Sequence, residues 1–193
     1  RIYESVLLNR YIALAEEKLD VMSSLAVICI TGSYGKTSIK NFLAQILKEK
    51  YRVYATPRSV NTHTGIIADI NSNLDYTTEI YIAEAGARLR GDIAIISEFL
   101  NPHYAVIGEI GEQHLEYFKN LDNIVETKFE LLQSKRLKKA FIFKDNPMPN
   151  QLDANLHKKI IPFPENIRNI KADLEGISFE LYIKGEWHYF EAI

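Results

Sequence analysis

The residues best suited to chemistry in this sequence stand in the segment TGSYGKTS, residues 31–38. Gly32 and Gly35 would let backbone N–H groups converge on an anion, with the start of a helix behind them. Lys36 would bring a positive charge to the β- and γ-phosphates of a nucleotide, and the hydroxyl of Thr37 would bind Mg²⁺. The segment therefore predicts a phosphate-binding loop.

This loop departs from the common pattern in two places. The pattern G-x-x-x-x-G-K-[ST] requires a glycine five residues before Gly35, and this chain has Ile30 there. A bulky Tyr34 also stands directly before Gly35. An ordinary turn between a strand and a helix is the alternative. The apolar run before the loop and the helical pattern after it favour phosphate binding.

Two further side chains follow apolar strands and fall on the same rim of the expected fold. Glu84 ends the segment IYIAE, and a carboxylate there can hold Mg²⁺ directly or through water. His114 follows another apolar strand, in GEIGEQHLE, and a neutral imidazole is a good metal ligand. Taken singly, a solvated strand-end acid and a surface-loop histidine are the plainer interpretations.

Lys128 lies where lysine is unusual. On a helix over residues 123–134 it falls in the middle of the apolar face, which holds Ile124, Val125, Phe129, Leu131 and Leu132. Snorkelling, with the stem buried and the ammonium in water, is the explanation that the sequence alone favours. The other is function, because desolvation lowers the pKa of a lysine and makes its amine nucleophilic. Such an amine can capture CO₂ as a carbamate, an anionic oxygen ligand for Mg²⁺.

The elements that must position these residues alternate between strands and helices. Strands are predicted at 25–30, 51–56, 79–86, 103–111 and 139–143, and helices at 1–20, 64–73, 91–100 and 122–134. The residues after the loop form the stripe of an amphipathic helix: Ile39, Phe42, Leu43, Ile46 and Leu47. The alternation predicts an α/β fold, a three-layer P-loop-type domain with a mostly parallel sheet and helices on both faces.

Ligands of such sheets bind at the carboxyl ends of the strands, so the loops after Ile30, Thr56, Ala83 and Ile110 are expected to line one site. Beyond residue 145 the pattern changes. Residues 177–190 alternate apolar and polar types around Gly185-Glu186, which predicts a β-hairpin. We expect a small antiparallel β extension of the sheet at the C-terminal end.

Composition narrows the class of protein. The 193 residues are 47% apolar and carry a formal charge of −2, a balance that argues against a nucleic-acid-binding surface. Cys29 is the only cysteine, which suits a reducing cytoplasm. No apolar run approaches the roughly 18 residues of a membrane span. Because the chain starts at Arg1, we expect it to be part of a longer protein.

Together these motifs resemble the central, ATP-binding domain of the Mur ligases. The resemblance rests on ITGSYGKTS, on Glu84 in AEAG, and on GEQHLEYF followed by Lys128. The family's loop has the short form T-G-x-x-G-K-[ST], which accounts for the missing glycine. Residues 84–132 are most similar to the D-alanyl-D-alanine-adding branch, which Lys40 also fits. Residues 1–24 would then be a linker helix from an N-terminal region, and 25–193 the ATP-binding domain.

The resemblance also implies roles for individual residues. The ATP-binding loop would comprise Thr31, Gly32, Ser33, Tyr34, Gly35, Lys36, Thr37 and Ser38. The catalytic residues would be Lys36, Glu84, His114 and Lys128. Thr37 and Glu84 would bind one Mg²⁺, and His114 with carbamylated Lys128 a second. Asn61, Thr62 and His63 would face the acceptor, the substrate whose carboxylate is activated by ATP. Thr62 stands where the family frequently has a second Asn, and Tyr34 stands where it more commonly has Asn. No side-chain role therefore carries over from the family to either residue.

The activity implied is ATP-dependent ligation of D-Ala-D-Ala to UDP-MurNAc-tripeptide through an acyl phosphate, in the bacterial cytoplasm. The family's UDP-binding N-terminal domain and its C-terminal domain do not fit in this length. We therefore expect the chain alone to bind ATP weakly and not to ligate. Another Mur ligase or folylpolyglutamate synthase is the first alternative. A P-loop module without catalysis is the second, although Glu84, His114 and Lys128 are all present.

Overall fold

The computed structural model describes residues 2–113, 115–172 and 177–192. They form two compact units, Arg1–Ile161 and Pro162–Ile193. The helices are α1 (Ile2–Val21), α2 (Lys36–Lys48), α3 (His63–Asn73), α4 (Asp92–Leu100), α5 (Leu115–Phe118), α6 (Leu121–Phe129), the 3₁₀ helix η1 (Glu130–Gln133) and α7 (Ala154–His157). The first strands are β1 (Ala26–Thr31), β2 (Val53–Ala55), β3 (Ile80–Glu84), β4 (Tyr104–Ile107), β5 (Lys139–Phe143) and β6 (Ile160–Phe163).

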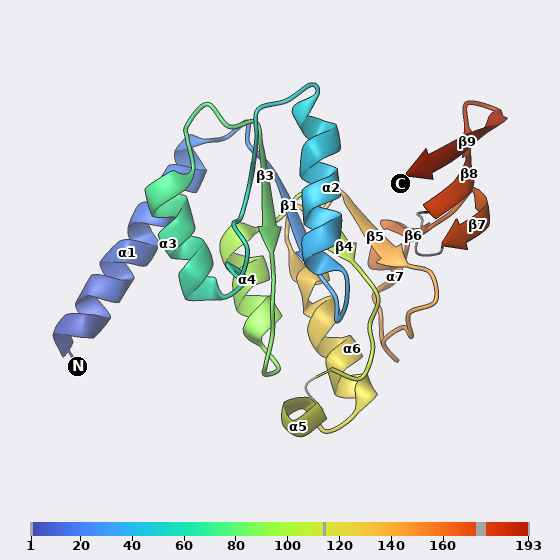
Figure 1. The fold of residues 1–193 in the computed structure, drawn as a ribbon. Coiled ribbons are helices and arrows are strands. Elements are labelled where there is room, and N and C mark those ends of the chain that lie inside the picture. Colours follow the sequence, from blue (N-terminus) through green and yellow to red (C-terminus); the bar gives the residue numbers. More distant parts are fainter. Residues whose placement is uncertain (1, 114, 173–176, 193) are drawn as a thin grey trace. The chain divides into compact units, whose positions relative to one another are not determined.

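A six-stranded sheet in the order β2-β3-β1-β4-β5-β6 forms the centre of the first unit (Figure 1). The pairs from β2 to β5 are parallel. From β1 the chain crosses to β2 through α2, and then returns across the sheet through α3, α4 and α6. Right-handed crossovers therefore place α2 on one face and the other three helices on the opposite face. The predicted three-layer α/β fold is confirmed.

The two central strands set the position of the polar residues that follow them. All of β3 is buried, and so is all of β1 except Ala26, as expected for strands covered on both faces. Each strand ends in a buried polar residue, Thr31 in β1 and Glu84 in β3. Because Ile30 pairs with Glu84, these two ends meet at the same edge of the sheet.

The helix after the glycine loop turns much of its apolar stripe away from the sheet. Phe42 and Ile46 are 66% and 69% exposed, whereas Lys40 and Ala44 are buried. The buried lysine explains this rotation, because its ammonium donates to the carbonyl oxygen of Thr56 at 2.6 Å. A buried charge without partners is far more costly than an exposed apolar side chain. The amphipathic helix is present, but its apolar stripe is not its most buried side.

The second unit is a separate antiparallel sheet of β7 (Ile167–Ala172), β8 (Ile177–Ile183) and β9 (Glu186–Ala192). Strands β8 and β9 form the predicted hairpin, with Ile183 paired to Glu186. Its two turn residues, Lys184 and Gly185, both have positive φ, as tight hairpins require. The antiparallel extension expected from the sequence is thus a sheet of its own. Across the described ranges, no helix combines the length and apolar character of a membrane span.

His103, in the loop before β4, links stability to pH. Its Nδ1 accepts a hydrogen bond from the backbone N–H of Val27 at 3.1 Å, so this nitrogen must be unprotonated. Burial lowers the pKa of His103, and the nearby Arg136 and Lys138 lower it further. The folded state therefore binds this proton less readily than the unfolded state. The stabilisation is complete above the unfolded pKa of about 6.5 and is lost as the pH falls toward the folded value.

We predict that His103→Asn reduces this pH dependence. The amide oxygen of Asn can stand where Nδ1 stands, and it does not titrate in this range. Between about pH 8 and about pH 5, the free energy of unfolding should fall further in the wild type than in the variant, by about 1 kcal/mol. Urea unfolding at the two pH values measures the difference. Equal losses in both proteins would show that this histidine does not carry the effect.

Candidate functional site

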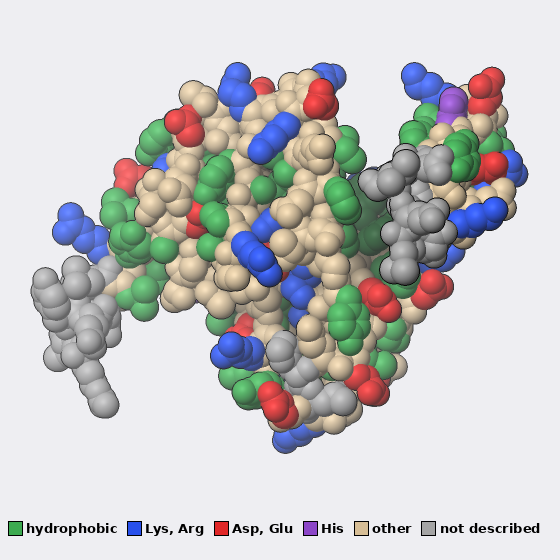
Figure 2. Space-filling view, viewed as in Figure 1, with side chains coloured by type: hydrophobic (Ala, Val, Ile, Leu, Met, Phe, Trp, Pro, Cys, Tyr) green, Lys and Arg blue, Asp and Glu red, His purple; other side chains and the backbone are tan. Residues whose placement is uncertain are grey.

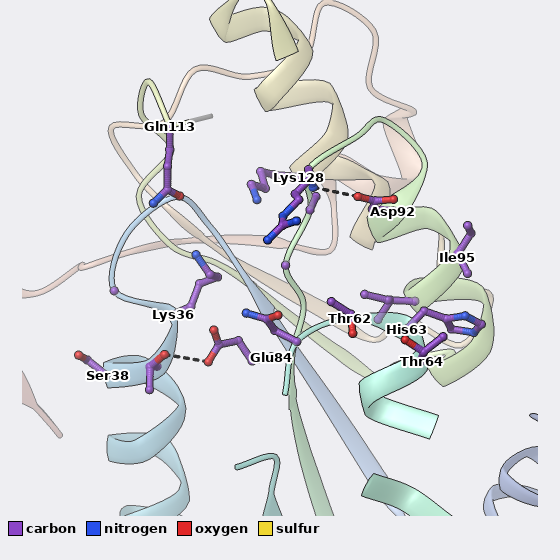
Figure 3. A pocket seen from close by; sticks show the side chains of 17 residues that line it. Lys36, Ser38, Thr62, His63, Thr64, Glu84, Asp92, Ile95, Gln113 and Lys128 are labelled. Carbon is purple, nitrogen blue, oxygen red and sulfur yellow. Dashed lines mark hydrogen bonds between the residues drawn. The ribbon is translucent and has the colours of Figure 1, made fainter. Parts of the chain in front are cut away.

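The carboxyl ends of the central strands open on a cavity of about 780 Å³ (Figure 3). Its lining comes from the glycine loop and α2, the 61–64 segment, the end of β3, α4, α6 and Gln113. The expectation that the loops after β1, β2, β3 and β4 meet in one place is therefore confirmed. On the face seen in Figure 2, basic side chains gather around a hollow near the start of α2. Lys36, Arg88 and Lys128 are the basic residues that line the cavity.

The two glycines of the loop are required for different physical reasons. Gly35 has φ 72° and directly precedes α2, so the first N–H groups of that helix are left for a ligand. Gly32 has φ 146°, and a Cβ there would lie 3.2 Å from the backbone of Gly108. The short loop is thus formed by one glycine that turns the chain and one that lets two backbones touch.

Lys36 lies folded back on its own loop. Its Nζ donates to the carbonyl oxygens of Gly32 at 2.8 Å and Ser33 at 3.0 Å. Burial lowers the pKa of Lys36, and the negative charge of Glu84 opposes that shift. Phosphate oxygens form stronger, charge-assisted hydrogen bonds than carbonyls do. A bound triphosphate would therefore draw this ammonium out of the loop and into the cavity.

Thr37 and Glu84 form the centre of the site. The Thr37 hydroxyl donates to Glu84 Oε2 at 2.9 Å, the dashed line beside Glu84 in Figure 3. Lys40 Nζ lies 3.6 Å from the same oxygen. Hydroxyl and carboxylate oxygens are the donors that Mg²⁺ prefers, so this pair fits a magnesium site. In the part of the chain that the structure describes, no three His, Cys, Asp or Glu side chains converge on a metal position. Further ligands of such an ion would come from phosphates and water.

Lys128 is buried, with 4% of its surface exposed, and it lines the same cavity. Its pKa is lowered to about 8, chiefly by burial and also by the charge of Lys36, while the charges of Asp92 and Glu130 oppose the shift. Its ammonium makes no hydrogen bond or ion pair to another described residue. Because only 4% of the residue is exposed, its ammonium is not held out in bulk water, and the snorkelling interpretation is wrong.

The residues expected to face the acceptor have distinct positions. Asn61 packs against Gly86, where a Cβ would lie 3.0 Å from the Asn61 side chain. The Gly86 N–H donates to the Asn61 carbonyl at 2.7 Å. Thr62 caps α3 by accepting the Gly65 N–H at 3.2 Å, a structural role that the sequence did not reveal. The His63 ring meets Phe99 edge-on at 5.3 Å. Asn61, Thr62 and His63 all line the cavity.

Tyr34 joins the glycine loop to the segment after β4. A Cβ on Gly111 would lie 2.6 Å from Tyr34 Cε2, so the ring packs directly on that glycine. The N–H groups of Ser33 and Tyr34 donate to the Glu109 carbonyl at 2.8 and 3.2 Å, and Ser33 Oγ donates to the Gly111 carbonyl at 3.0 Å. His114 follows this segment and lies outside the described residues.

Sequence reasoning missed two carboxylates that hold the start of α4, of which Asp92 lines the cavity. Asp92, in the first turn of α4, accepts the N–H groups of Arg88 at 2.8 Å and Leu89 at 2.9 Å. Glu130 accepts the N–H groups of Gly91 at 2.9 Å and Ala94 at 3.0 Å, so it caps the same helix from η1. The Asp after a glycine at the start of a helical pattern is a capping signal. No local sequence pattern predicts the role of Glu130.

Comparison with known proteins gives a consistent result. Residues 30–190 match the family described as "Mur ligase middle domain". A UDP-N-acetylmuramoyl-tripeptide–D-alanyl-D-alanine ligase from Rickettsia prowazekii is 37% identical over 112 residues, which cover 58% of this chain and 25% of the relative. The Bacillus subtilis ligase of the same name is 32% identical over 134 residues, 64% of this chain and 29% of the relative. This chain thus matches less than a third of the length of either relative.

Among solved structures, the MurF ligase from Thermotoga maritima in complex with ADP superposes with a TM-score of 0.80. Its sequence is 26% identical, and the match covers 95% of this chain and 44% of that chain.

We predict that Gly111→Ala destabilises the chain through Tyr34. The added methyl group overlaps the ring, and the ring must move off its packing surface. Because Tyr34 is 46% exposed and can shift, the loss should be about 1 kcal/mol. Urea unfolding of Gly111→Ala, Tyr34→Ser and the double variant measures the coupling. The double variant should lose less than the sum of the two single losses; strict additivity would rule out this contact as the cause.

Proposed function

The chain belongs to the Mur ligase family, and on that basis we propose that it is the ATP-binding domain of a ligase that joins D-alanyl-D-alanine to UDP-N-acetylmuramoyl-tripeptide. The names of its relatives in Rickettsia and Bacillus support these substrates, and with them a role in peptidoglycan synthesis. The ADP in the Thermotoga ligase supports ATP as the nucleotide. A cytoplasmic location agrees with a lone, buried, unpaired Cys29.

One observation carries the proposal. The Thr37 hydroxyl and the Glu84 carboxylate meet at 2.9 Å at the start of α2, and a buried lysine with a lowered pKa lines the same cavity. A plain nucleotide-binding module requires the first pair but has no use for a desolvated Lys128. A ligase requires both, because it must bring two anions together and hold them there.

The proposed reaction begins with the acceptor. Its terminal carboxylate attacks the γ-phosphorus, ADP leaves, and an acyl phosphate forms; the amine of D-Ala-D-Ala then attacks the acyl carbon, inorganic phosphate leaves and the amine loses a proton. Lys36 would leave the carbonyls of Gly32 and Ser33 and neutralise charge on the transferring phosphate. Thr37 and Glu84 would hold Mg²⁺, which would supply further positive charge against the phosphates. Asn61 and His63 would orient the carboxylate.

Lys128 would serve in this reaction as a carbamate. With a pKa of about 8, about a tenth of the amine is neutral at pH 7, far more than for an ordinary lysine. The nitrogen lone pair attacks CO₂, an N–C bond forms and one proton is released, which turns a cation into an anionic oxygen donor. With His114, it would hold a second Mg²⁺ near the acceptor. As plain ammonium, Lys128 would repel that ion.

The domain assignment is part of the same proposal. Residues 1–24 would be the linker from an N-terminal domain that binds the UDP-sugar, and 25–193 the ATP-binding domain. A C-terminal domain would deliver the incoming amine. The chain alone should therefore bind ATP weakly and form no amide.

Substrate choice is tested by ADP release from the full-length protein. We expect release only when UDP-MurNAc-tripeptide and D-Ala-D-Ala are both present, because the acyl phosphate turns over only when the amine consumes it. ADP release with a single amino acid and a shorter UDP-precursor would identify another Mur ligase. ADP release with glutamate and a folate would identify a folylpolyglutamate synthase. ATP binding without release on any substrate pair would favour the module without catalysis.

Lys128→Ala tests the carbamate. Ligation should fall about a hundredfold or more, because an anionic ligand of the reacting centre is lost. Wild-type activity should also fall in CO₂-depleted buffer and return with bicarbonate. The matched control is Lys144→Ala, which removes an exposed lysine and should behave as the wild type. Full activity of Lys128→Ala at low CO₂ would exclude the carbamate while leaving the ligase assignment in place.

A further inference from the structure

Lys40 is a buried cation that the proposed reaction does not use. It stands one helical turn after Lys36, and only 2% of its side chain is exposed. Its Nζ donates to the carbonyl oxygens of Thr56 at 2.6 Å and Pro57 at 3.4 Å, and lies 3.6 Å from Glu84 Oε2. The ammonium therefore joins α2, the end of β3 and the loop after β2.

The carboxylate beside it is equally enclosed. The Glu84 side chain is 5% exposed, and its Oε2 also accepts the Thr37 hydroxyl. The Glu84 N–H donates to the Thr56 hydroxyl at 3.2 Å, so Thr56 contacts both members of the pair. A carboxylate buried this deeply requires a positive partner. Oε2 accepts the Thr37 hydrogen bond and faces the Lys40 charge, whereas Oε1 accepts no hydrogen bond from the described residues and is left for a metal.

The two lysines of α2 differ in one respect that matters. Lys36 is held by carbonyls of its own loop and lines the cavity, so a phosphate can draw it away. Lys40 is absent from that lining and is held by Thr56 and Glu84. Its charge therefore stays at Glu84 whatever occupies the cavity.

We propose that Lys40 is a built-in counter-ion of Glu84, which keeps the site assembled without nucleotide and makes divalent-metal binding depend on the nucleotide. The inference rests on the proposed metal role of Glu84. The fixed charge on Lys40 repels a second cation at the same carboxylate, and this repulsion is strong at short range in a buried site. A free divalent ion thus meets a carboxylate that is already neutralised. The negative charge of a triphosphate attracts the metal ion and overcomes its repulsion by Lys40.

Binding of Mn²⁺ alone, followed by electron paramagnetic resonance on the 193-residue chain, tests the proposal. The wild type should bind free Mn²⁺ only weakly at this site. Lys40→Met removes the charge and keeps an unbranched side chain, and it should bind free Mn²⁺ at least tenfold more tightly. Adding Glu84→Gln to Lys40→Met should abolish that gain. The matched control Lys48→Met, on an exposed position of the same helix, should bind as the wild type does.

A folded Lys40→Met with no gain in Mn²⁺ affinity would overturn the proposal. If that variant does not fold, the wild type is measured instead. Tight binding of free Mn²⁺ that Glu84→Gln removes would also overturn the proposal. Weak binding of Mn²⁺ that a non-hydrolysable ATP analogue strengthens tenfold or more would support it. These measurements need no ligation. If the substrate assay fails while Lys40→Met binds Mn²⁺ more tightly as expected, only the ligase assignment is rejected.

Discussion

The carboxylate of Glu84 accepts the hydroxyl of Thr37 and lies beside the ammonium of Lys40, almost closed to water. Because a buried carboxylate must keep its partners, this contact fixes the rotation of α2, the end of β3 and the start of the loop that leads to Asn61. Phe42 on α2 is exposed because the helix is rotated to bury Lys40. The elements that carry the glycine loop and the 61–64 segment are thus held together by one ion pair rather than by apolar packing alone.

A second constraint is the closeness of the glycine loop to the segment after β4. Gly32 meets the backbone of Gly108, and Tyr34 packs on Gly111. Backbone hydrogen bonds from Ser33 and Tyr34 to Glu109 complete the contact. Because the two segments have no space between them, each fixes the position of the other.

The sequence was sufficient where a pattern is local, and insufficient where partners are distant. The unbroken apolar runs of β1 and β3 predicted buried parallel strands, and their polar ends located Thr31 and Glu84. The side of α2 that is buried could not be predicted, because Lys40 finds its partners in Thr56 and Glu84, which are remote in the chain. The burial of Lys128 depends on neighbours in the same way, so the sequence alone favoured a solvated ammonium.

The central claim is that this site activates a carboxylate by phosphorylation, and the fate of one oxygen atom tests it. Full-length protein would be given UDP-MurNAc-tripeptide with ¹⁸O in its terminal carboxylate, together with ATP and D-Ala-D-Ala. An acyl phosphate passes one carboxylate oxygen to the phosphate that leaves, so the inorganic phosphate should carry one ¹⁸O for each amide formed. Amide formation with unlabelled inorganic phosphate, or with the label in AMP, would contradict the account.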